Sequence, residues 1–232
     1  MTDLKNNPQL RQTAVSRSRF IPMLFSTPMV QAILHGTKTE TRRIIKYPKK
    51  ITDAKIGFSV FTEATEFEVH GIHETGQFGC SIFNKPVNKG DIIWVRETFF
   101  DASNFQDATL FKYKSTIIYK ADETFIGCHK WKPSLFMPKN ACRLFLEVVS
   151  VSVERLQDID EQSAINEGVG KYKDTAHFCD YMSKPSDRSR FRFAIDSYKS
   201  LWQKINGQDS YDLNPWVWVY KFRSVSIPAD FC

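Results

Sequence analysis

From residue 20 onwards, short runs of apolar residues alternate with turn-forming residues, and most of these runs have the length of strands. Four large apolar residues at 92–95 follow Gly90 and Asp91, a pattern typical of a central strand buried on both faces. The strongest strand signal is 142–154, and a shorter run at 21–25 predicts the first strand. The remaining apolar runs predict strands at 115–119 and 216–222 and a meander or β insertion within 51–88.

A short helix is predicted directly after the first strand, because the apolar residues of 27–34 recur at helical spacing. Thr27 matches an N-cap, and Pro28 matches the first helical position, where its missing N–H carries no penalty. Gly36 matches the glycine that commonly follows a helix. The segment therefore has a start signal, an apolar face and a stop signal.

Two further helices are predicted in the C-terminal half. Asp158 and Glu161 match a capping pattern that begins a short helix, with Gly168 as its stop. The longest helix is predicted over about 187–206 and ends at Gly207. Its aromatic residues keep helical spacing and are assigned to the core; they are Phe191, Tyr198 and Trp202.

The order of these elements defines the expected fold. Strands outnumber helices and nothing alternates as β-α-β, so we predict an α+β domain on a barrel-like, mostly antiparallel sheet with short flanking helices and one longer C-terminal helix. Residues 1–19 are polar, basic and aperiodic and are expected to form a flexible arm. A single domain is expected over 20–224, with insertions around 51–85 and 98–130, followed by a tail at 225–232.

Charge is distributed unevenly along the chain. The net charge is +6, but the first 50 residues carry ten basic and only two acidic side chains, and the remaining 182 residues sum to −2. A basic concentration of this kind attracts phosphate backbones. A solvated tail with a few loop lysines explains the same charge, and from charge alone the two interpretations are equal.

Other features of the composition exclude several classes. No apolar stretch approaches the roughly 20 residues that a membrane helix needs, and the N-terminus lacks the apolar region of a secretory signal. The five cysteines and five histidines are scattered without the spacing of metal ligands. We therefore expect a cytoplasmic protein with reduced thiols and neither a membrane nor a metal among its partners.

The segment 35–43 is the most informative for chemistry, because donors, hydroxyls and one carboxylate follow a helix-ending glycine at once. Lys38 and Thr41 form a workable base–nucleophile pair if a turn brings them together, since a neutral lysine activates a hydroxyl. Lys38 and Arg43 are equally suited to binding a phosphate or a base carbonyl without any reaction. A solvated basic turn is the third interpretation of this segment.

The spacing Gly36-x-Lys38-x-x-Thr41-x-Arg43 resembles the GxKxxExR signature of the ASCH domain, a PUA-like fold. Three of the four positions match, and Thr41 stands where the common pattern has Glu. The segment 90–97 (GDIIWVRE) is similar to the strand that follows in this superfamily. The segments that resemble ASCH proteins of phages and prophages are Trp131-Lys132-Pro133-Ser134, Met137-Pro138, Glu154-Arg155-Leu156 and 214–218 (NPWVW). The resemblance covers about residues 20–224.

The resemblance implies a set of functional residues. Bacterial N4-acetylcytidine amidohydrolases, one branch of the family, have a threonine at the position of Thr41, and their catalytic set is a lysine, this threonine and a glutamate on a later helix. Lys38 and Thr41 match residue for residue, and Glu167 is the candidate glutamate, with Glu161 as its alternative. Such an enzyme uses no metal and no organic cofactor.

The residues expected to bind substrate or nucleic acid surround the same motif or lie in the other matching segments. Arg43 is expected to stabilise an oxyanion or to bind the base carbonyl, and Trp131 is the aromatic expected to stack on a base. The full set is Gly36, Thr39, Arg42, Arg43, Arg96, Trp131 and Lys132. Two alternatives to the amidohydrolase stay open, namely a non-catalytic reader of RNA or modified nucleic acid and an ASCH-type ribonuclease.

Overall fold

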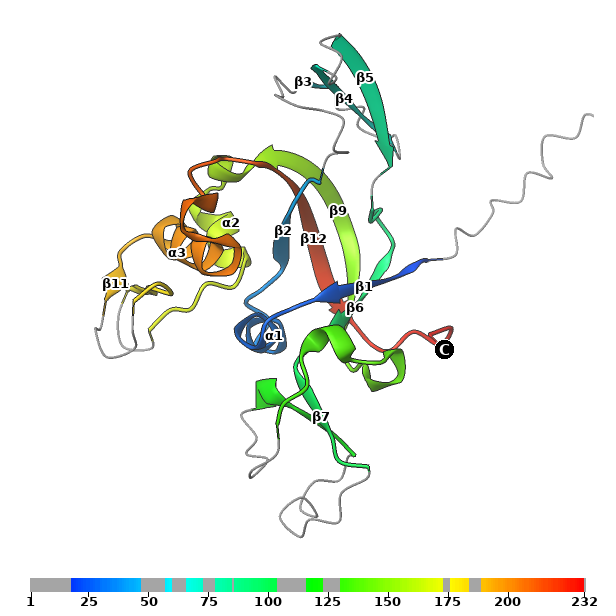
Figure 1. The fold of residues 1–232 in the computed structure, drawn as a ribbon. Helices are drawn as coiled ribbons and strands as arrows, with labels where there is room; N and C mark the ends of the chain where they lie inside the picture. The colour runs from blue at the N-terminus through cyan, green and yellow to red at the C-terminus, as the bar shows by residue number, and fades with distance from the viewer. Residues whose placement is uncertain are drawn as a thin grey trace, which may run out of the picture.

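A five-stranded sheet lies at the centre of the molecule, in a computed structural model that describes residues 18–46, 57–59, 66–72, 78–84, 86–103, 116–122, 130–172, 176–183 and 189–231. Its strand order is β1-β6-β9-β12-β2 (Figure 1). The strands are Phe20–Leu24 (β1), Ile92–Arg96 (β6), Phe145–Arg155 (β9), Trp216–Val225 (β12) and Glu40–Ile44 (β2). β1 runs parallel to β6, and every other neighbouring pair is antiparallel.

The mixed α+β class and the mostly antiparallel pairing are confirmed. The first four residues of β6 are buried, as expected for a strand covered on both faces. The long strands β9 and β12 curve towards the helices at one end (Figure 1). β1 and β2 are the two edges of this sheet, and no pairing joins them among the described residues. The described strands therefore form an open, curved sheet and do not close into a barrel.

Three smaller sheets lie outside the central one. A separate antiparallel meander contains β3 (Gly57–Ser59), β4 (Glu66–Ile72) and β5 (Phe78–Asn84), as predicted for this region. β7 (Phe99–Asp101) pairs with β8 (Ile117–Tyr119), and β10 (Phe178–Cys179) pairs with β11 (Arg190–Phe191). Both segments expected to be insertions therefore carry strands that pair locally. The predicted arm lies outside the described residues except for its last two.

The first helix, α1 (Thr27–Leu34), is confirmed in its position and its stop signal. Its N-cap is Ser26 and not Thr27, because Ser26 is the last residue with an extended backbone (ψ 158°) and Thr27 is already helical. Gly36 follows the helix with φ +72°, a left-handed conformation that glycine adopts without strain. This glycine turns the chain from α1 into β2.

The second helix, α2 (Glu161–Asn166), is capped by Asp160 and not by Asp158. The Asp160 carboxylate accepts a hydrogen bond of 2.6 Å from the backbone N–H of Ser163, whereas Asp158 belongs to a preceding 3₁₀ turn. The capping prediction was wrong by two residues because both aspartates precede the same apolar positions.

The 3₁₀ helices of the described residues are Lys120–Asp122, Ser134–Phe136, Lys139–Ala141, Leu156–Asp158 and Gln208–Ser210.

The longest helix, α3, spans Ala194–Asn206 and ends at Gly207 as predicted, but its predicted start near residue 187 was wrong. Arg190–Phe191 pairs instead with β10, and Phe193 is still extended. The carboxylate of Glu161 accepts hydrogen bonds from the backbone N–H groups of Ala194 (2.8 Å) and Ile195 (3.3 Å). Glu161 therefore caps α3, a helix distant in sequence.

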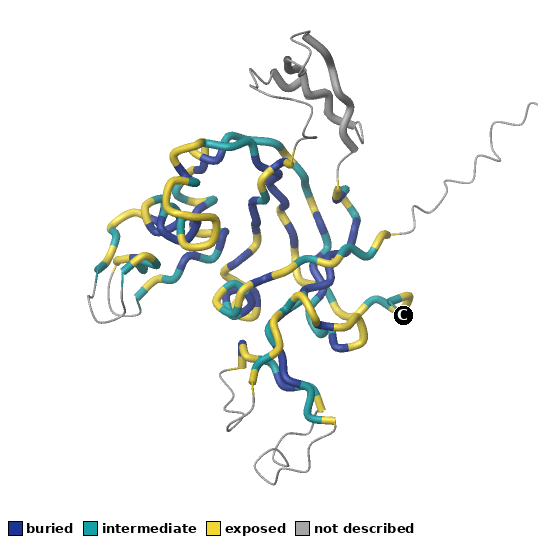
Figure 2. Tube along the Cα trace, viewed as in Figure 1, coloured by how far each residue is buried: buried dark blue, intermediate teal, exposed yellow. Residues whose placement is uncertain are grey.

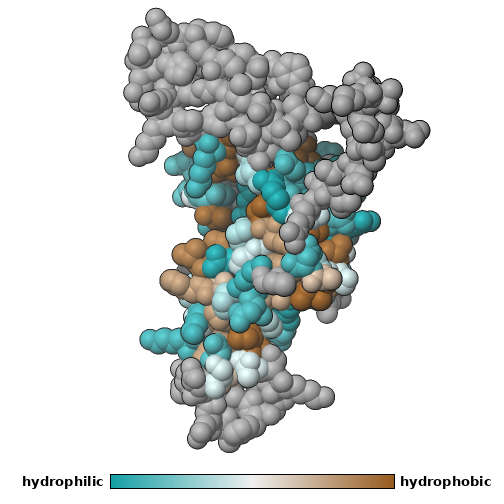
Figure 3. All heavy atoms as spheres, turned by 90° about the vertical axis from the view of Figure 1, so that its right-hand side faces the viewer, coloured by the Kyte–Doolittle hydropathy of each residue, from teal (hydrophilic) through white to brown (hydrophobic). Residues whose placement is uncertain are grey.

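Two apolar clusters separate the layers of the molecule. Trp218 and Tyr220 of β12 pack in a cluster that includes α1, whereas Val217 and Val219 pack in a cluster with α2 and α3. This alternation follows from the two-residue period of a strand, and Figure 2 shows the buried positions along the central strands. Hydrophobic and hydrophilic patches alternate on the face seen in Figure 3. Among the described residues, no helix is long and apolar enough to cross a membrane.

Candidate functional site

The motif segment after α1 is fixed by backbone hydrogen bonds to both neighbouring helices. The N–H of Lys38 donates to the carbonyl of Ala32 in α1 at 3.1 Å. The N–H of Thr39 donates to the carbonyl of Asn166 at the end of α2 at 2.8 Å. The segment therefore enters β2 from a defined position between α1 and α2.

Lys38 and Glu167 face each other across this junction and form an isolated antiparallel bridge. Gly168 follows with φ +82°, and a Cβ atom built on it would lie 2.8 Å from the Cβ atoms of both Ala32 and Lys38. Real Cβ atoms do not approach so closely, so only glycine fits here without displacement. The close contact between the end of α2 and the motif segment depends on this glycine.

The side chains of Lys38 and Glu167 form a buried ion pair. The Lys38 Nζ lies 2.6 Å from the Glu167 Oε2, and the two side chains are 0% and 3% exposed. The same ammonium group donates to the backbone carbonyls of Glu40 and Glu167, each at 2.7 Å. An ammonium group has three protons to donate, so Lys38 is fully satisfied by the protein.

The environment of Lys38 acts on its charge in two directions. Burial lowers the pKa of the Lys38 ammonium below its ordinary value, and the nearby guanidinium groups of Arg43 and Arg42 act in the same direction. The carboxylate of Glu167 opposes this effect but does not cancel it. Lys38 therefore loses its proton more readily than an exposed lysine does.

Arg42 extends the ion pair into a network of carboxylates. One of its terminal nitrogens lies 3.4 Å from both Glu40 and Glu167, and the other lies 3.2 Å from Glu154. Burial alone would lower the pKa of Arg42, but the neighbouring negative charges, with that of Glu167 the largest, raise it above its ordinary value. Arg42 is thus a permanent cation that holds Glu40 and Glu167 together.

Glu40 is the second buried carboxylate of the cluster and is 2% exposed. It accepts a hydrogen bond from the Asn166 amide at 3.2 Å and lies 3.2 Å from the ammonium of Lys221. Lys38 and Arg42 are therefore balanced by Glu40 and Glu167 inside the protein. Such a balance is needed, because a buried charge without a partner costs several kcal/mol.

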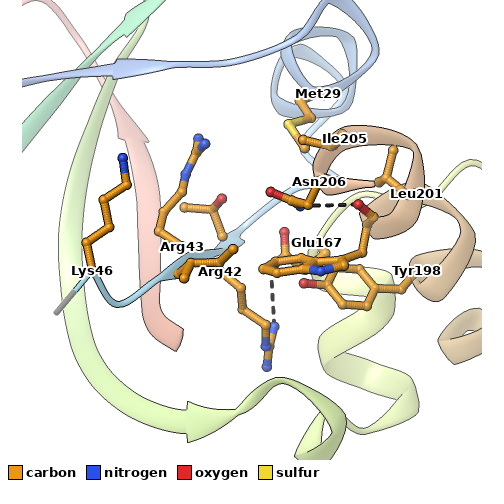
Figure 4. A pocket seen from close by; sticks show the side chains of 12 residues that line it. Met29, Arg42, Arg43, Lys46, Glu167, Tyr198, Leu201, Ile205 and Asn206 are labelled. Carbon is orange, nitrogen blue, oxygen red and sulfur yellow. Dashed lines mark hydrogen bonds and ion pairs between the residues drawn. The ribbon is translucent and has the colours of Figure 1, made fainter. Parts of the chain in front are cut away.

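A pocket of about 300 Å³ adjoins this cluster, between β2 and α3. In Figure 4, Arg43 projects from β2 and Lys46 from the residues just after it, and Tyr198, Leu201, Ile205 and Asn206 project from α3. The complete lining is Met29, Thr41, Arg42, Arg43, Ile44, Lys46, Glu167, Tyr198, Leu201, Trp202, Ile205 and Asn206. An apolar wall thus faces a strand with a hydroxyl and cations, a combination typical of small-molecule sites.

Several buried polar atoms of the pocket-lining side chains have no hydrogen-bond partner among the described residues. They are the Nε atoms of Arg42 and Arg43, the hydroxyl of Tyr198 and the Nε1 of Trp202. Burial raises the pKa of Tyr198 well above its ordinary value, and the charge of Glu167 adds to this, so the phenol stays protonated. Unpaired buried donors are unfavourable, and all four of these atoms belong to side chains that line the pocket.

The structure brings together the residues predicted to be catalytic. Thr41 and Glu167 line the pocket, whereas Lys38 does not line it and is connected to it by its ion pair with Glu167. The Thr41 side chain makes no hydrogen bond within the described part of the chain. Glu161, the alternative carboxylate, caps α3 instead and does not line the pocket.

The residues expected to bind substrate fall into three groups. Arg42 and Arg43 line the pocket, and the Arg43 guanidinium also donates to the carbonyl of Leu24 at 2.7 Å. Gly36 and Thr39 are exposed, and both have structural roles of their backbone. Gly36 forms the turn after α1, and the N–H of Thr39 bonds to the end of α2. The remaining three are outside this pocket, and they are Arg96, Trp131 and Lys132.

Sequence reasoning missed several residues of the site, and three of them bear on its chemistry. Glu40 carried no pattern of its own, and only the fold shows that its carboxylate turns inward. Tyr198 and Trp202 were assigned to the core, and they are indeed 3% and 5% exposed, but both also line the pocket. The available signal was their polar atoms, because a buried phenol or indole usually requires a partner.

No protein-family model, curated protein or solved structure matches this chain. No group of three or more His, Cys, Asp or Glu side chains suited to a metal ion occurs among the described residues.

Proposed function

We propose that the β2–α3 pocket binds a single nucleobase and that the protein removes the acyl group of an N4-acylated cytidine. The resemblance of the motif to the ASCH signature suggests this substrate. One observation carries the proposal: Thr41 and Glu167 line the same pocket, and Glu167 is ion-paired with the buried Lys38. The central sheet is mostly antiparallel, and this agrees with the α+β class expected for a PUA-like fold.

The reaction that we propose has two steps. The Thr41 hydroxyl attacks the acyl carbon while its proton passes to neutral Lys38. The C–N bond then breaks, and the amino group of cytidine leaves with that proton. Water hydrolyses the Thr41 ester, which releases the carboxylic acid and restores the hydroxyl. Because burial lowers the pKa of Lys38, a larger fraction of this residue is neutral near physiological pH than for an exposed lysine.

The lining of the pocket supplies the binding that this reaction needs. The guanidinium of Arg43 lines the pocket and is suited to the carbonyl oxygens of the base and of the acyl group. The apolar side chains of Met29, Leu201 and Ile205 form a wall for the face of the base. A volume of about 300 Å³ lies at the lower end of the range for small-molecule sites, which suits a single base.

A non-catalytic reader of nucleobases is the second candidate, and a specific observation favours it. All three ammonium protons of Lys38 have acceptors, an arrangement that stabilises the charged form, which is not a base. In a reader the same pocket binds a base without turnover.

Incubation of the pure protein with N4-acetylcytidine, followed by chromatography of the products, separates the two candidates. In the enzyme, Thr41→Val lowers turnover by at least about 100-fold, the effect of losing a nucleophile or its base, and Thr41→Ser retains it. The rate rises with pH towards the lowered pKa of Lys38, because only neutral Lys38 accepts the proton. Binding of the nucleoside to Thr41→Val stays within a few-fold, since one hydroxyl contributes about 0.5–1.5 kcal/mol.

Thr37→Val is the matched control for this experiment. It also removes one hydroxyl, but Thr37 is exposed, bonds only to Ala32 and does not line the pocket. Turnover by Thr41→Val at the wild-type rate would exclude the nucleophile role. Binding of the nucleoside by the wild type without turnover would establish the reader.

A further inference from the structure

A second pocket lies apart from the first and shares no lining residue with it. It has a volume of about 650 Å³ and is formed by β7 and the segment 130–138. Its chemistry is set by three aromatic residues, two lysines and one aspartate, namely Phe99, Trp131, Phe136, Lys130, Lys132 and Asp101. Phe99 is 2% exposed, so the pocket presents the rings of Trp131 and Phe136 beside a net positive charge.

The segment that forms this pocket is held by backbone hydrogen bonds, although most of its side chains are exposed. Lys132 and Phe99 exchange two backbone hydrogen bonds, of 2.8 and 3.2 Å. The N–H groups of Phe136 and Met137 close a 3₁₀ turn onto Pro133 and Ser134, at 3.0 and 3.1 Å. Met137 anchors the turn, with an exposed fraction of 1%.

This anchoring keeps a large aromatic side chain in water. Phe136 is 67% exposed and the neighbouring Leu135 is 58% exposed. The guanidinium of Arg96 donates to the Leu135 carbonyl and fixes the tip of the turn. An exposed aromatic ring on a fixed backbone loses little conformational entropy when a ligand binds, so the segment is preorganised for binding.

We infer that this pocket is a second nucleic-acid site, which binds unpaired nucleotides of a single strand by stacking on Trp131 and Phe136. Aromatic rings beside cations are the usual means of holding single strands. Lys130 and Lys132 are both exposed and available to phosphates, whereas Asp101 is the single acid of the lining. The charge favours a polyanion over a peptide, although prolines and aromatics also suit a proline-rich segment.

This inference goes beyond the proposed function, because it concerns the binding of a single-stranded nucleic acid and not of the base in the first pocket. The test is the binding of a fluorescent oligouridylate of about ten nucleotides, which is within the usual range of site sizes. Phe136→Ala is expected to weaken binding roughly 5- to 100-fold, the loss of one stacked base, and Phe136→Tyr is expected to retain it. Lys132→Ala is expected to reduce the salt slope by about 0.7, the value for one phosphate of a single strand.

Matched controls are available elsewhere on the surface. Ile227→Ala removes a side chain that is 65% exposed, close to the 67% of Phe136, and Lys89→Ala removes an exposed lysine outside both pockets. Neither is expected to change binding of the oligonucleotide. Thermal melting of each variant separates a loss of affinity from a loss of fold.

Turnover or binding of N4-acetylcytidine, measured on the same preparations, separates this inference from the proposed function. Phe136→Ala is expected to leave both unchanged. Wild-type affinity of Phe136→Ala for the oligonucleotide would overturn the inference, and so would a wild-type protein that does not bind the strand. Displacement of the strand by a proline-rich peptide that binds more tightly would assign the pocket to a protein partner instead.

Discussion

Lys38 is the residue whose role depends most closely on its neighbours. Its ammonium group has three acceptors and no exposure, so its removal leaves Glu167 buried without its closest cation. Lys38→Met is expected to lower the free energy of unfolding by about 3–5 kcal/mol, the usual cost of breaking a buried pair from one side. In the double variant Lys38→Met/Glu167→Gln, the loss is expected to be smaller than the sum of the two single losses. Urea unfolding of the four proteins measures this coupling.

Lys221→Met provides the comparison at the rim of the same cluster. Lys221 also contacts a buried carboxylate, that of Glu40, but its own side chain is 49% exposed. Exposed ion pairs contribute about 0–1 kcal/mol to stability. The free energy of unfolding of this variant is therefore expected to lie within about 1 kcal/mol of that of the wild type. Additive losses from Lys38→Met and Glu167→Gln would mean that the two side chains do not act as a pair.

At the scale of single residues, the sequence predicted those site members that belong to a continuous motif. Lys38, Thr41, Arg42 and Arg43 lie within six positions of one another, and their proximity needs only a turn. Glu167 was named through a family resemblance, and no spacing in the chain connects it to Lys38. Tyr198 reaches the pocket only through the packing of α3, which a sequence alone does not define.

Among the elements, the contact between the end of α2 and the motif segment is the one that positions the site. Gly168→Ala is expected to destabilise the protein by at least about 2 kcal/mol, because it adds left-handed strain of about 1–2 kcal/mol to an overpacked contact. The new methyl group would lie 2.8 Å from Ala32 and Lys38. Thermal or urea unfolding measures the loss, and turnover is expected to fall as Lys38 is displaced.

Gly90→Ala is the matched control for the strain. Gly90 has a similar conformation, φ +86° against +82°, but a Cβ atom there would meet nothing within 4 Å. Its substitution is therefore expected to cost only the backbone strain, about 1–2 kcal/mol. Equal losses at both glycines would show that the contact with Lys38 is not tight.

The elements themselves were predictable where local signals agreed. α1 has a proline at its start, an apolar face and a glycine at its end, and its bounds were predicted closely. The start of α3 was misplaced because its cap is the distant Glu161, and the apolar period continues into residues that pair with β10. Tertiary contacts override local periodicity in such cases.

For the molecule as a whole, the two separate pockets differ in whether the proposed ligand contact involves phosphate charge. Under the two proposals, the β2–α3 pocket would bind an uncharged base, whereas the pocket at 130–138 and the basic N-terminal residues would contact phosphates. Only the second kind of contact releases counterions when it forms. Binding of a single-stranded nucleic acid should therefore depend steeply on the salt concentration, and turnover of a free nucleoside should not.

A chain that begins at residue 18 tests this separation. It lacks Lys5, Arg11 and Arg17 and one acid, Asp3, but keeps Arg19, whose guanidinium is paired with Asp91 at 2.5 Å. The salt slope for oligouridylate is expected to become shallower by up to about 2, or roughly 0.7 for each phosphate contact that is lost. The melting temperature and the turnover of N4-acetylcytidine are expected to stay unchanged, because every residue of the β2–α3 pocket is retained. Loss of nucleoside turnover in parallel with strand binding would contradict the separation, since the N-terminal residues would then belong to the active site.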